Sequence, residues 1–216
     1  MAVGRGRRGN EQDGKIRGWS LSLAWGDQPD SVAPYVPSPI PIVREMLDLA
    51  KAGPGDILYD LGCGDGRILF TAIEEYNVDE AVGYDLNSLM VKALKQKIKE
   101  KGLTDRIKVF KGNFFDVDLT PATLVTLYLT TSGNAKLRPK FERELNEGAR
   151  VVSHDFPIQG WFTSKPDGDF YSFGSHKVYL YIVPMAYKKN ASVMRSKGEE
   201  DRWSRVRRLF RSLDRT

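Results

Sequence analysis

The sequence predicts an α/β fold built on a parallel sheet, and three observations support this prediction. Residues 57–61 form a short apolar run that contains one acid and is closed by glycine, which is typical of a buried strand. Gly62, Gly64 and Gly66 then follow at alternate positions and lead into a segment with a helical pattern. A second apolar strand pattern, at 81–85, follows that helix, so that strand, glycine turn, helix and strand form a βαβ unit.

Composition limits the class of protein. The 216 residues are enough for one domain with a substantial core, and 41% hydrophobic with 28% charged residues are typical of a globular chain. No apolar stretch approaches the roughly 20 residues of a membrane span, and no secretory leader pattern is seen. Cys63 is the single cysteine, which excludes an internal disulfide framework and favours a cytoplasmic location. Cys63 and the two histidines give no metal-ligand spacing, so that no metal site is expected.

The net charge of +5 is concentrated at the two ends of the chain. Residues 1–18 carry +3 and residues 195–216 carry +4, which leaves −2 for residues 19–194. The first of these segments consists of Gly, Arg and polar residues and cannot bury enough apolar surface to fold by itself. The basic ends are therefore candidates for contact with DNA or RNA, and a solubilising leader is the alternative for residues 1–18. The nearly neutral charge of the body argues against a nucleic-acid groove on the domain itself.

The C-terminal end has the pattern of an amphipathic helix. Such a helix docks on its own domain, lies on an anionic membrane or holds a nucleic-acid-rich partner, and these alternatives stay open. We divide the chain into a basic, largely disordered arm (1–33), a folded domain (34–187) and a basic amphipathic tail (188–216). The apolar residues of the tail recur at three- and four-residue spacing and would share one helix face: Trp203, Val206, Phe210 and Leu213.

The folded domain begins with a proline-rich segment. Residues 34–41 contain four prolines in eight positions, which forces an extended path. Apolar residues at helical spacing then predict a helix that starts near Ser38 or Pro39 and ends at 53–55, Gly-Pro-Gly. A stiff segment directly before the first strand is placed to fold over a bound ligand, and plain wrapping of the N-terminus is the alternative.

The glycine turn indicates which nucleotide is bound. A dinucleotide site has the spacing G-x-G-x-x-G, because a pyrophosphate lies on the helix N-terminus. Here the third glycine comes one residue early, and Asp60 and Asp65 flank the turn. Two carboxylates would repel a pyrophosphate, but they suit a ligand that carries positive charge. S-adenosylmethionine has an ammonium and a sulfonium group and no phosphate, so that the turn favours this cofactor.

The second strand ends in an acid, Asp85, which lies 23 residues after Gly62. In a βαβ unit this distance places the acid beside the nucleotide ribose, whose two hydroxyls a carboxylate can accept. A solvated loop acid is the alternative. A helix follows at 88–101 and ends at Gly102, and a third strand is expected at 107–111.

The second half of the domain continues the alternation. We expect a fourth strand at 123–130, a helix at 136–145, a fifth strand at 149–156 and a last strand at 177–183. Residues 157–175 are rich in glycine, aromatic and turn residues, which fits either a loop or strand over the substrate side or an ordinary connection.

Five segments taken together resemble the archaeal protein lysine methyltransferase family: 35–39, 59–67, 111–116, 150–156 and 160–161. That family belongs to the class I, or seven-β-strand, methyltransferases and is related to mitochondrial lysine methyltransferases and to the non-SET histone lysine methyltransferase. The resemblance covers about residues 34–184 and implies a Rossmann-like sheet, mostly parallel with an antiparallel C-terminal strand, with helices on both faces. The chain departs from the family pattern at two places. Asp85 stands where a glutamate is usual, and the sequence of residues 130–134, a loop that faces the substrate in this family, differs.

The resemblance also implies the site. The end of the third strand faces adenine in this family, where the amide of Asn113 offers a donor and an acceptor and Phe114 either stacks or packs in the core. The expected cofactor residues are Tyr35, Ser38, Asp60, Gly62, Cys63, Gly64, Asp65, Gly66, Asp85, Asn113 and Phe114. The expected catalytic residues, which would line an aromatic lysine channel, are Tyr35, Tyr128, Phe156 and Trp161.

The implied activity is methyl transfer from S-adenosylmethionine to lysine ε-amino groups of proteins, by a monomeric enzyme. His154 is a candidate general base, and a structural histidine is the alternative. Three other functions stay open. A nucleic-acid base methyltransferase usually has an Asn/Asp-Pro-Pro-aromatic motif after the fourth strand, where this chain has Leu-Thr-Thr-Ser at 129–132. The others are a small-molecule methyltransferase and an inactive module that binds nucleic acid through its arms, although the intact Asp60 and Asp85 argue against the last.

Overall fold

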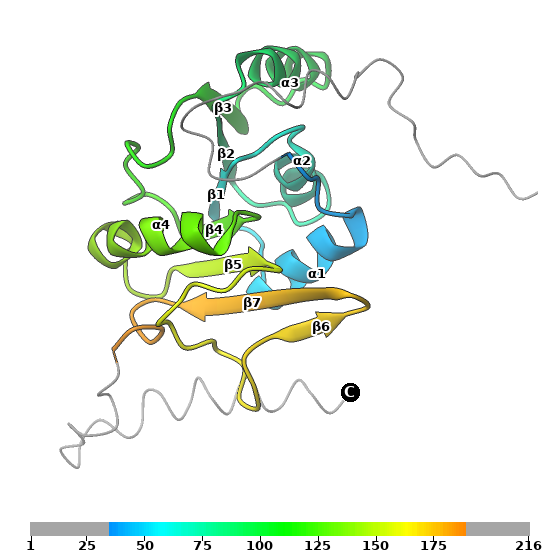
Figure 1. The fold of residues 1–216 in the computed structure, drawn as a ribbon. Helices are drawn as coiled ribbons and strands as arrows, with labels where there is room; N and C mark the ends of the chain where they lie inside the picture. The colour runs from blue at the N-terminus through cyan, green and yellow to red at the C-terminus, as the bar shows by residue number, and fades with distance from the viewer. Residues whose placement is uncertain (1–34, 189–216) are drawn as a thin grey trace, which may run out of the picture.

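The computed structural model describes residues 35–188, which form the domain shown in Figure 1. The predictions for the basic arm (1–33) and for the amphipathic tail beyond 188 lie outside the described residues. Among the helices of the described part, none is long and apolar enough to cross a membrane.

One mixed sheet organises the domain, and its strand order is β3-β2-β1-β4-β5-β7-β6. The first five strands in this order pair in parallel, and β7 runs antiparallel to both β5 and β6. The strands are β1 (Ile57–Leu61), β2 (Glu80–Asp85), β3 (Ile107–Lys111), β4 (Leu124–Leu127), β5 (Arg150–His154), β6 (Tyr171–Phe173) and β7 (His176–Ile182). The predicted fold class, a mostly parallel sheet with antiparallel C-terminal pairing, is confirmed.

Helices cover both faces of the sheet (Figure 1). Apolar side chains of three helices pack into one buried cluster with the sheet, while α4 packs into a second cluster with the loops that follow β3 and β5. The helices are α1 (Ile40–Ala50), α2 (Arg67–Glu74), α3 (Ser88–Glu100) and α4 (Thr131–Glu144). Helices α1, α2 and α3 contribute to the first cluster. They cover one face of the sheet, and α4 with the two loops covers the other.

The fourth helix begins earlier than the sequence pattern predicts. Its expected range was 136–145, whereas the observed helix starts at Thr131. The physical reason is a cap, because the hydroxyl of Thr130 accepts a hydrogen bond from the backbone N–H of Gly133 at 3.2 Å. The expected fourth strand is correspondingly shorter and ends at Leu127.

The strand order reverses direction between β1 and β4, since β2 and β3 continue the sheet on one side and β4 and β5 on the other. The carboxyl ends of these parallel strands therefore meet at one edge. In open α/β sheets a ligand binds at such a switch point, outside the carboxyl ends of the strands. This edge contains the glycine turn, the end of β2 and the segments that follow β4 and β5.

Candidate cofactor and substrate site

The turn after β1 requires glycine at three places. Gly62, Gly64 and Gly66 have φ values of 91°, 51° and 75°, in the left-handed region that side chains disfavour. The backbone N–H groups of Gly62 and Cys63 both donate to the carbonyl of Tyr84, at 2.9 and 3.0 Å. The turn is thereby fastened to β2, which places it directly beside the carboxyl end of that strand.

Asp85 lies at the tip of β2 as predicted, and it is half-buried. One carboxylate oxygen accepts from the backbone N–H of Gly64 at 2.9 Å, and the other accepts from the N–H of Asn87 at 2.8 Å. Each oxygen keeps a further lone pair, because a carboxylate offers about four acceptor positions. The carboxylate is thus held in place by the turn itself and can still accept hydroxyl groups of a ligand.

The proline-rich segment folds back onto the glycine turn. The ring of Tyr35 lies so close to Gly64 that a Cβ on that glycine would be 2.7 Å from the ring carbon Cε2. Burial, together with the charge of Asp65, raises the pKa of Tyr35 to about 12. Arg67 pairs with Asp65 at 2.7 Å and donates to the carbonyl of Ser38 at 2.8 Å. These contacts fix the segment over the turn.

Two of the expected cofactor residues have buried side chains. Asp60 is 3% exposed and accepts a hydrogen bond from the hydroxyl of Thr126 at 2.8 Å. Cys63 is 5% exposed, and its sulfur lies against Gly83, where an added Cβ would be 2.7 Å from it. Burial raises the pKa of the Cys63 thiol well above its usual value, so that it is an inert packing residue.

Burial also raises the pKa of Asp60 to about 7. In the unfolded chain this carboxyl loses its proton near pH 4, whereas the folded protein keeps the proton to about pH 7. The group therefore lowers the unfolding free energy as pH rises between these values, by at most about 1.4 kcal/mol per pH unit. Asp60→Asn is expected to gain stability relative to wild type from pH 5 to 7, as measured by chemical denaturation without cofactor. Asp79→Asn, at an exposed position, serves as the control, and an equal response of both variants would contradict the assignment.

The two expected cofactor residues that follow β3, Asn113 and Phe114, differ in their surroundings. The side-chain oxygen of Asn113 accepts from the backbone N–H of Phe115 at 3.1 Å, which leaves its amide N–H groups for a ligand. Phe114 is 6% exposed and belongs to the buried cluster on the α4 face. Of the two alternatives for Phe114, packing in the core is the one that the structure favours.

On the substrate side, the rings of Tyr128 and Phe156 lie near each other, and Trp161 is buried. The Tyr128 ring lies 6.2 Å from the ring of Phe156, and Phe156 is 37% exposed at the surface. Trp161 is 7% exposed and packs against Phe141 of α4, while its indole N–H donates to Glu142 at 2.9 Å. Trp161 is thus part of the core beside α4.

His154 is fully buried, and its environment favours the structural alternative over a general base. Its Nδ1 lies 2.8 Å from the hydroxyl of Ser38, and its ring lies 3.9 Å from that of Tyr128. Burial lowers the pKa of His154 to about 4, so that the ring is neutral near pH 7. The Ser38 hydroxyl is therefore hydrogen-bonded to His154 of β5 and not to the glycine turn.

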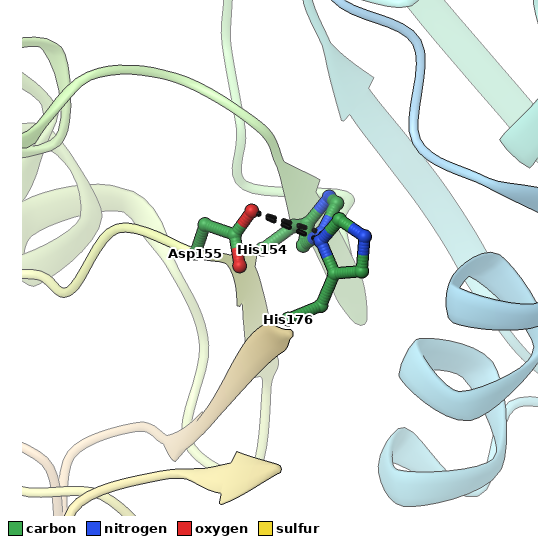
Figure 2. Close-up of side chains that lie close together, drawn as sticks. All are labelled: His154, Asp155 and His176. Atoms are coloured by element: carbon green, nitrogen blue, oxygen red, sulfur yellow. Dashed lines mark hydrogen bonds and ion pairs between the residues drawn. The ribbon is translucent and has the colours of Figure 1, made fainter. Parts of the chain in front are cut away.

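Sequence reasoning missed Arg67, which ties the proline-rich segment to the turn, and it missed a group formed by His154, Asp155 and His176. The His154 Nε2 lies 2.9 Å from the His176 Nδ1 (Figure 2). His176 is 22 residues further along the chain, and only the antiparallel pairing of β5 with β7 brings the two together. Metal-ligand motifs are recognised by short spacings along the sequence, and these two histidines are too far apart in sequence to form one.

Comparison with known proteins agrees with this architecture. A family profile described as the ANTKMT methyltransferase domain matches residues 60–165. A protein-lysine N-methyltransferase of Saccharolobus islandicus is 47% identical over 154 residues, which cover 69% of this chain and 93% of that protein. The adenine nucleotide translocase lysine N-methyltransferase of Mus musculus is 31% identical and covers 69% of this chain, but the match spans only 63% of the mouse protein.

A solved structure is also similar. The crystal structure of an RNA methyltransferase from Salinibacter ruber, in complex with S-adenosyl-L-homocysteine, superimposes with a TM-score of 0.66 at 37% identity, covering 72% of this chain and 98% of that one. The fold is therefore that of a class I methyltransferase. Because the chain spans nearly all of the Saccharolobus protein at 47% identity, it belongs to the family of archaeal protein-lysine N-methyltransferases.

Proposed function

We propose that this protein transfers a methyl group from S-adenosylmethionine to lysine ε-amino groups of protein substrates. The observation that carries the proposal is the 47% identity to a protein-lysine N-methyltransferase over 93% of that relative. The mitochondrial relatives that modify the adenine nucleotide translocase and subunit c of ATP synthase support the same acceptor group, since both are lysine N-methyltransferases.

The described residues fit this cofactor. Asp85 would accept the two ribose hydroxyls with the lone pairs that the turn leaves available. The glycine turn offers a close approach to backbone, and the Asp85 carboxylate beside it carries negative charge that favours a cationic ligand. The amide N–H groups of Asn113, which follows β3, would donate to the adenine edge. When bound, the cofactor supplies an electrophilic methyl group.

The role of the protein toward lysine is alignment and desolvation. A lysine amine has a pKa near 10.4, so that only about 0.04% of it is neutral at pH 7. Contact with the aromatic rings of Tyr35, Tyr128 and Phe156 would lower that pKa by removing water from the ammonium group. The same rings would hold the amine in line with the methyl group, which removes much of the entropic part of the barrier.

The rate of methylation is expected to rise from pH 7 to pH 9. The neutral amine is the nucleophile, and below the pKa of the bound lysine its population rises about tenfold per pH unit. The measurement is the initial rate of label transfer into a lysine-containing protein substrate at fixed ionic strength. A rate that falls over this range would contradict a free-amine nucleophile.

A second candidate function is methylation of RNA, which the similarity to the Salinibacter RNA methyltransferase favours. The segment after β4 argues against it, because Leu129-Thr-Thr-Ser stands where enzymes that act on exocyclic base amines usually carry Asn/Asp-Pro-Pro-aromatic. Lysine methylation therefore stays the proposal, and separate digestion of the labelled product with protease and with nuclease distinguishes the two functions.

We further propose that the enzyme is a monomer in the cytoplasm and that its basic ends contact DNA or RNA. The +4 charge of 195–216 supports the last point. Deletion of 195–216 is expected to leave methylation of a free peptide unchanged and to reduce nucleic-acid binding. The loss should be confined to the salt-sensitive part of the affinity, because it comes from phosphate neutralisation. Equal binding by the full and shortened chains at low salt would contradict the nucleic-acid role.

A further inference from the structure

The carboxyl end of β5 and the start of β7 bring together a group that the proposed methyl transfer does not use. It consists of His154, Asp155 and His176, whose side chains converge in Figure 2. The His154 Nε2 lies 2.9 Å from the His176 Nδ1, and the Asp155 Oδ2 lies 3.3 Å from the first and 3.2 Å from the second. Among the described residues, these three form a set of close potential metal ligands.

The size of this triangle matches a coordination sphere. Zn²⁺ binds imidazole nitrogen and carboxylate oxygen at about 2.0–2.2 Å, so that neighbouring ligand atoms lie roughly 3.3–3.6 Å apart in a tetrahedral site and about 2.8–3.1 Å apart in an octahedral one. The three observed edges, 2.9, 3.2 and 3.3 Å, fall across this span. An ion would fit above the triangle after shifts of a few tenths of an ångström.

Neighbouring groups orient the ligand atoms. The other ring nitrogen of His154 can donate its N–H to the hydroxyl of Ser38, at 2.8 Å, which leaves a lone pair on Nε2. The other oxygen of Asp155 accepts the backbone N–H of Lys177 at 2.8 Å, which holds Oδ2 toward the histidines. Metal-binding histidines and carboxylates in proteins are held by outer partners of this kind.

The Tyr128 hydroxyl also donates to the Asp155 Oδ2, at 3.3 Å, so that in this tautomer what hydrogen bonding leaves unresolved is the contact between that oxygen and the His154 Nε2. One N–H of His176 faces two acceptors, the His154 Nε2 and the Asp155 Oδ2. Whichever it serves, a nitrogen lone pair and a carboxylate oxygen of His154 and Asp155 face each other at 3.3 Å with no proton between them. A divalent cation would remove this repulsion and bind all three atoms at once.

We propose that His154, Asp155 and His176 bind one divalent transition-metal ion. The ion is Zn²⁺, because two imidazoles and one carboxylate are a ligand set that Zn²⁺ prefers. The side chains of His176 and Asp155 are 30% and 25% exposed, so that the ion can enter and a fourth position is left for water. The ion joins β5 to β7 and, through Ser38, holds the segment that covers the glycine turn. The site is structural, and it goes beyond the proposed methyl transfer and does not depend on it.

Two variants remove a ligand with little damage to the fold. His176→Ala is at a half-buried position, whereas His154 is fully enclosed and is left intact. Asp155→Asn keeps an oxygen for the Lys177 N–H, and asparagine tolerates the φ of 57° at this position. Asp169→Asn, which removes an exposed carboxyl from the loop before β6, is the matched control.

The full chain, without a histidine tag, is stripped with a chelator, dialysed and titrated with Zn²⁺ by calorimetry. One Zn²⁺ per chain is expected for wild type and for Asp169→Asn, with binding more than about tenfold weaker in His176→Ala and Asp155→Asn. Zn²⁺ should raise the Tm of wild type but not of His176→Ala. Co²⁺ in wild type should give the intense visible absorption of a four-coordinate site. Equal Zn²⁺ binding by wild type and the two ligand variants, or no binding by wild type, would overturn the proposal.

Discussion

Replacement of Asp85 by alanine is expected to weaken S-adenosylmethionine binding by roughly 1–3 kcal/mol, the cost of leaving hydrogen-bond partners unsatisfied. The carboxylate holds the backbone N–H groups of Gly64 and Asn87 and would accept the ribose hydroxyls as well. Its removal therefore acts on the ligand directly and on the turn that forms the site. Calorimetric titration with the cofactor gives the loss of affinity.

The control for this variant is Asp79→Ala, because Asp79 lies just before the opposite end of the same strand and is exposed. It should bind the cofactor as wild type does. The domain of Asp85→Ala should stay folded, because this half-buried side chain belongs to neither buried cluster. An unchanged circular dichroism spectrum would show this. Wild-type affinity in Asp85→Ala would remove Asp85 from the ribose site.

Alanine at Gly64 is expected to lower cofactor affinity more than tenfold while the domain stays folded. Two costs combine at this position. A side chain at φ 51° costs roughly 1–2 kcal/mol, and its Cβ would lie 2.7 Å from the ring of Tyr35. The ring must therefore move away from the turn, and the cover over the cofactor site is displaced. Affinity is measured by calorimetry, and the position of the ring by the assigned NMR signals of Tyr35.

Gly102→Ala separates the two costs. Gly102 also has a left-handed φ, 67°, but an added Cβ would meet nothing within 4 Å. This variant is expected to lose similar stability from backbone strain and to keep full cofactor affinity. If Gly64→Ala and Gly102→Ala bound the cofactor equally well, the contact between Tyr35 and the turn would have no part in binding.

The features that the sequence predicted correctly are those encoded over short distances. Three alternate glycines and the acid at the tip of the second strand follow from a single βαβ unit, and the structure joins them through the hydrogen bond from Gly64 to Asp85. The order of strands and helices also follows from local periodicity. The start of α4 was missed because a capping hydroxyl, that of Thr130, outweighed a weak apolar pattern.

Side-chain direction is what the sequence could not give. Asp60, Cys63 and Trp161 lie in segments that border the site, yet all three side chains are buried in the core. Which way each points depends on the faces of the sheet and on packing against α4 or β2, which only the assembled fold determines. The contact of His154 with His176 depends in the same way on the register of β5 with β7.

Radiolabelled S-adenosylmethionine tests the central claim most directly. The purified protein is incubated with the labelled cofactor and a cell lysate, and equal portions are then digested with protease or with nuclease. Lysine methylation predicts label that is released by protease, survives nuclease and appears as methyl-lysine after hydrolysis. Label that survives protease and is lost to nuclease would contradict the account and identify the enzyme as a methyltransferase of nucleic acid.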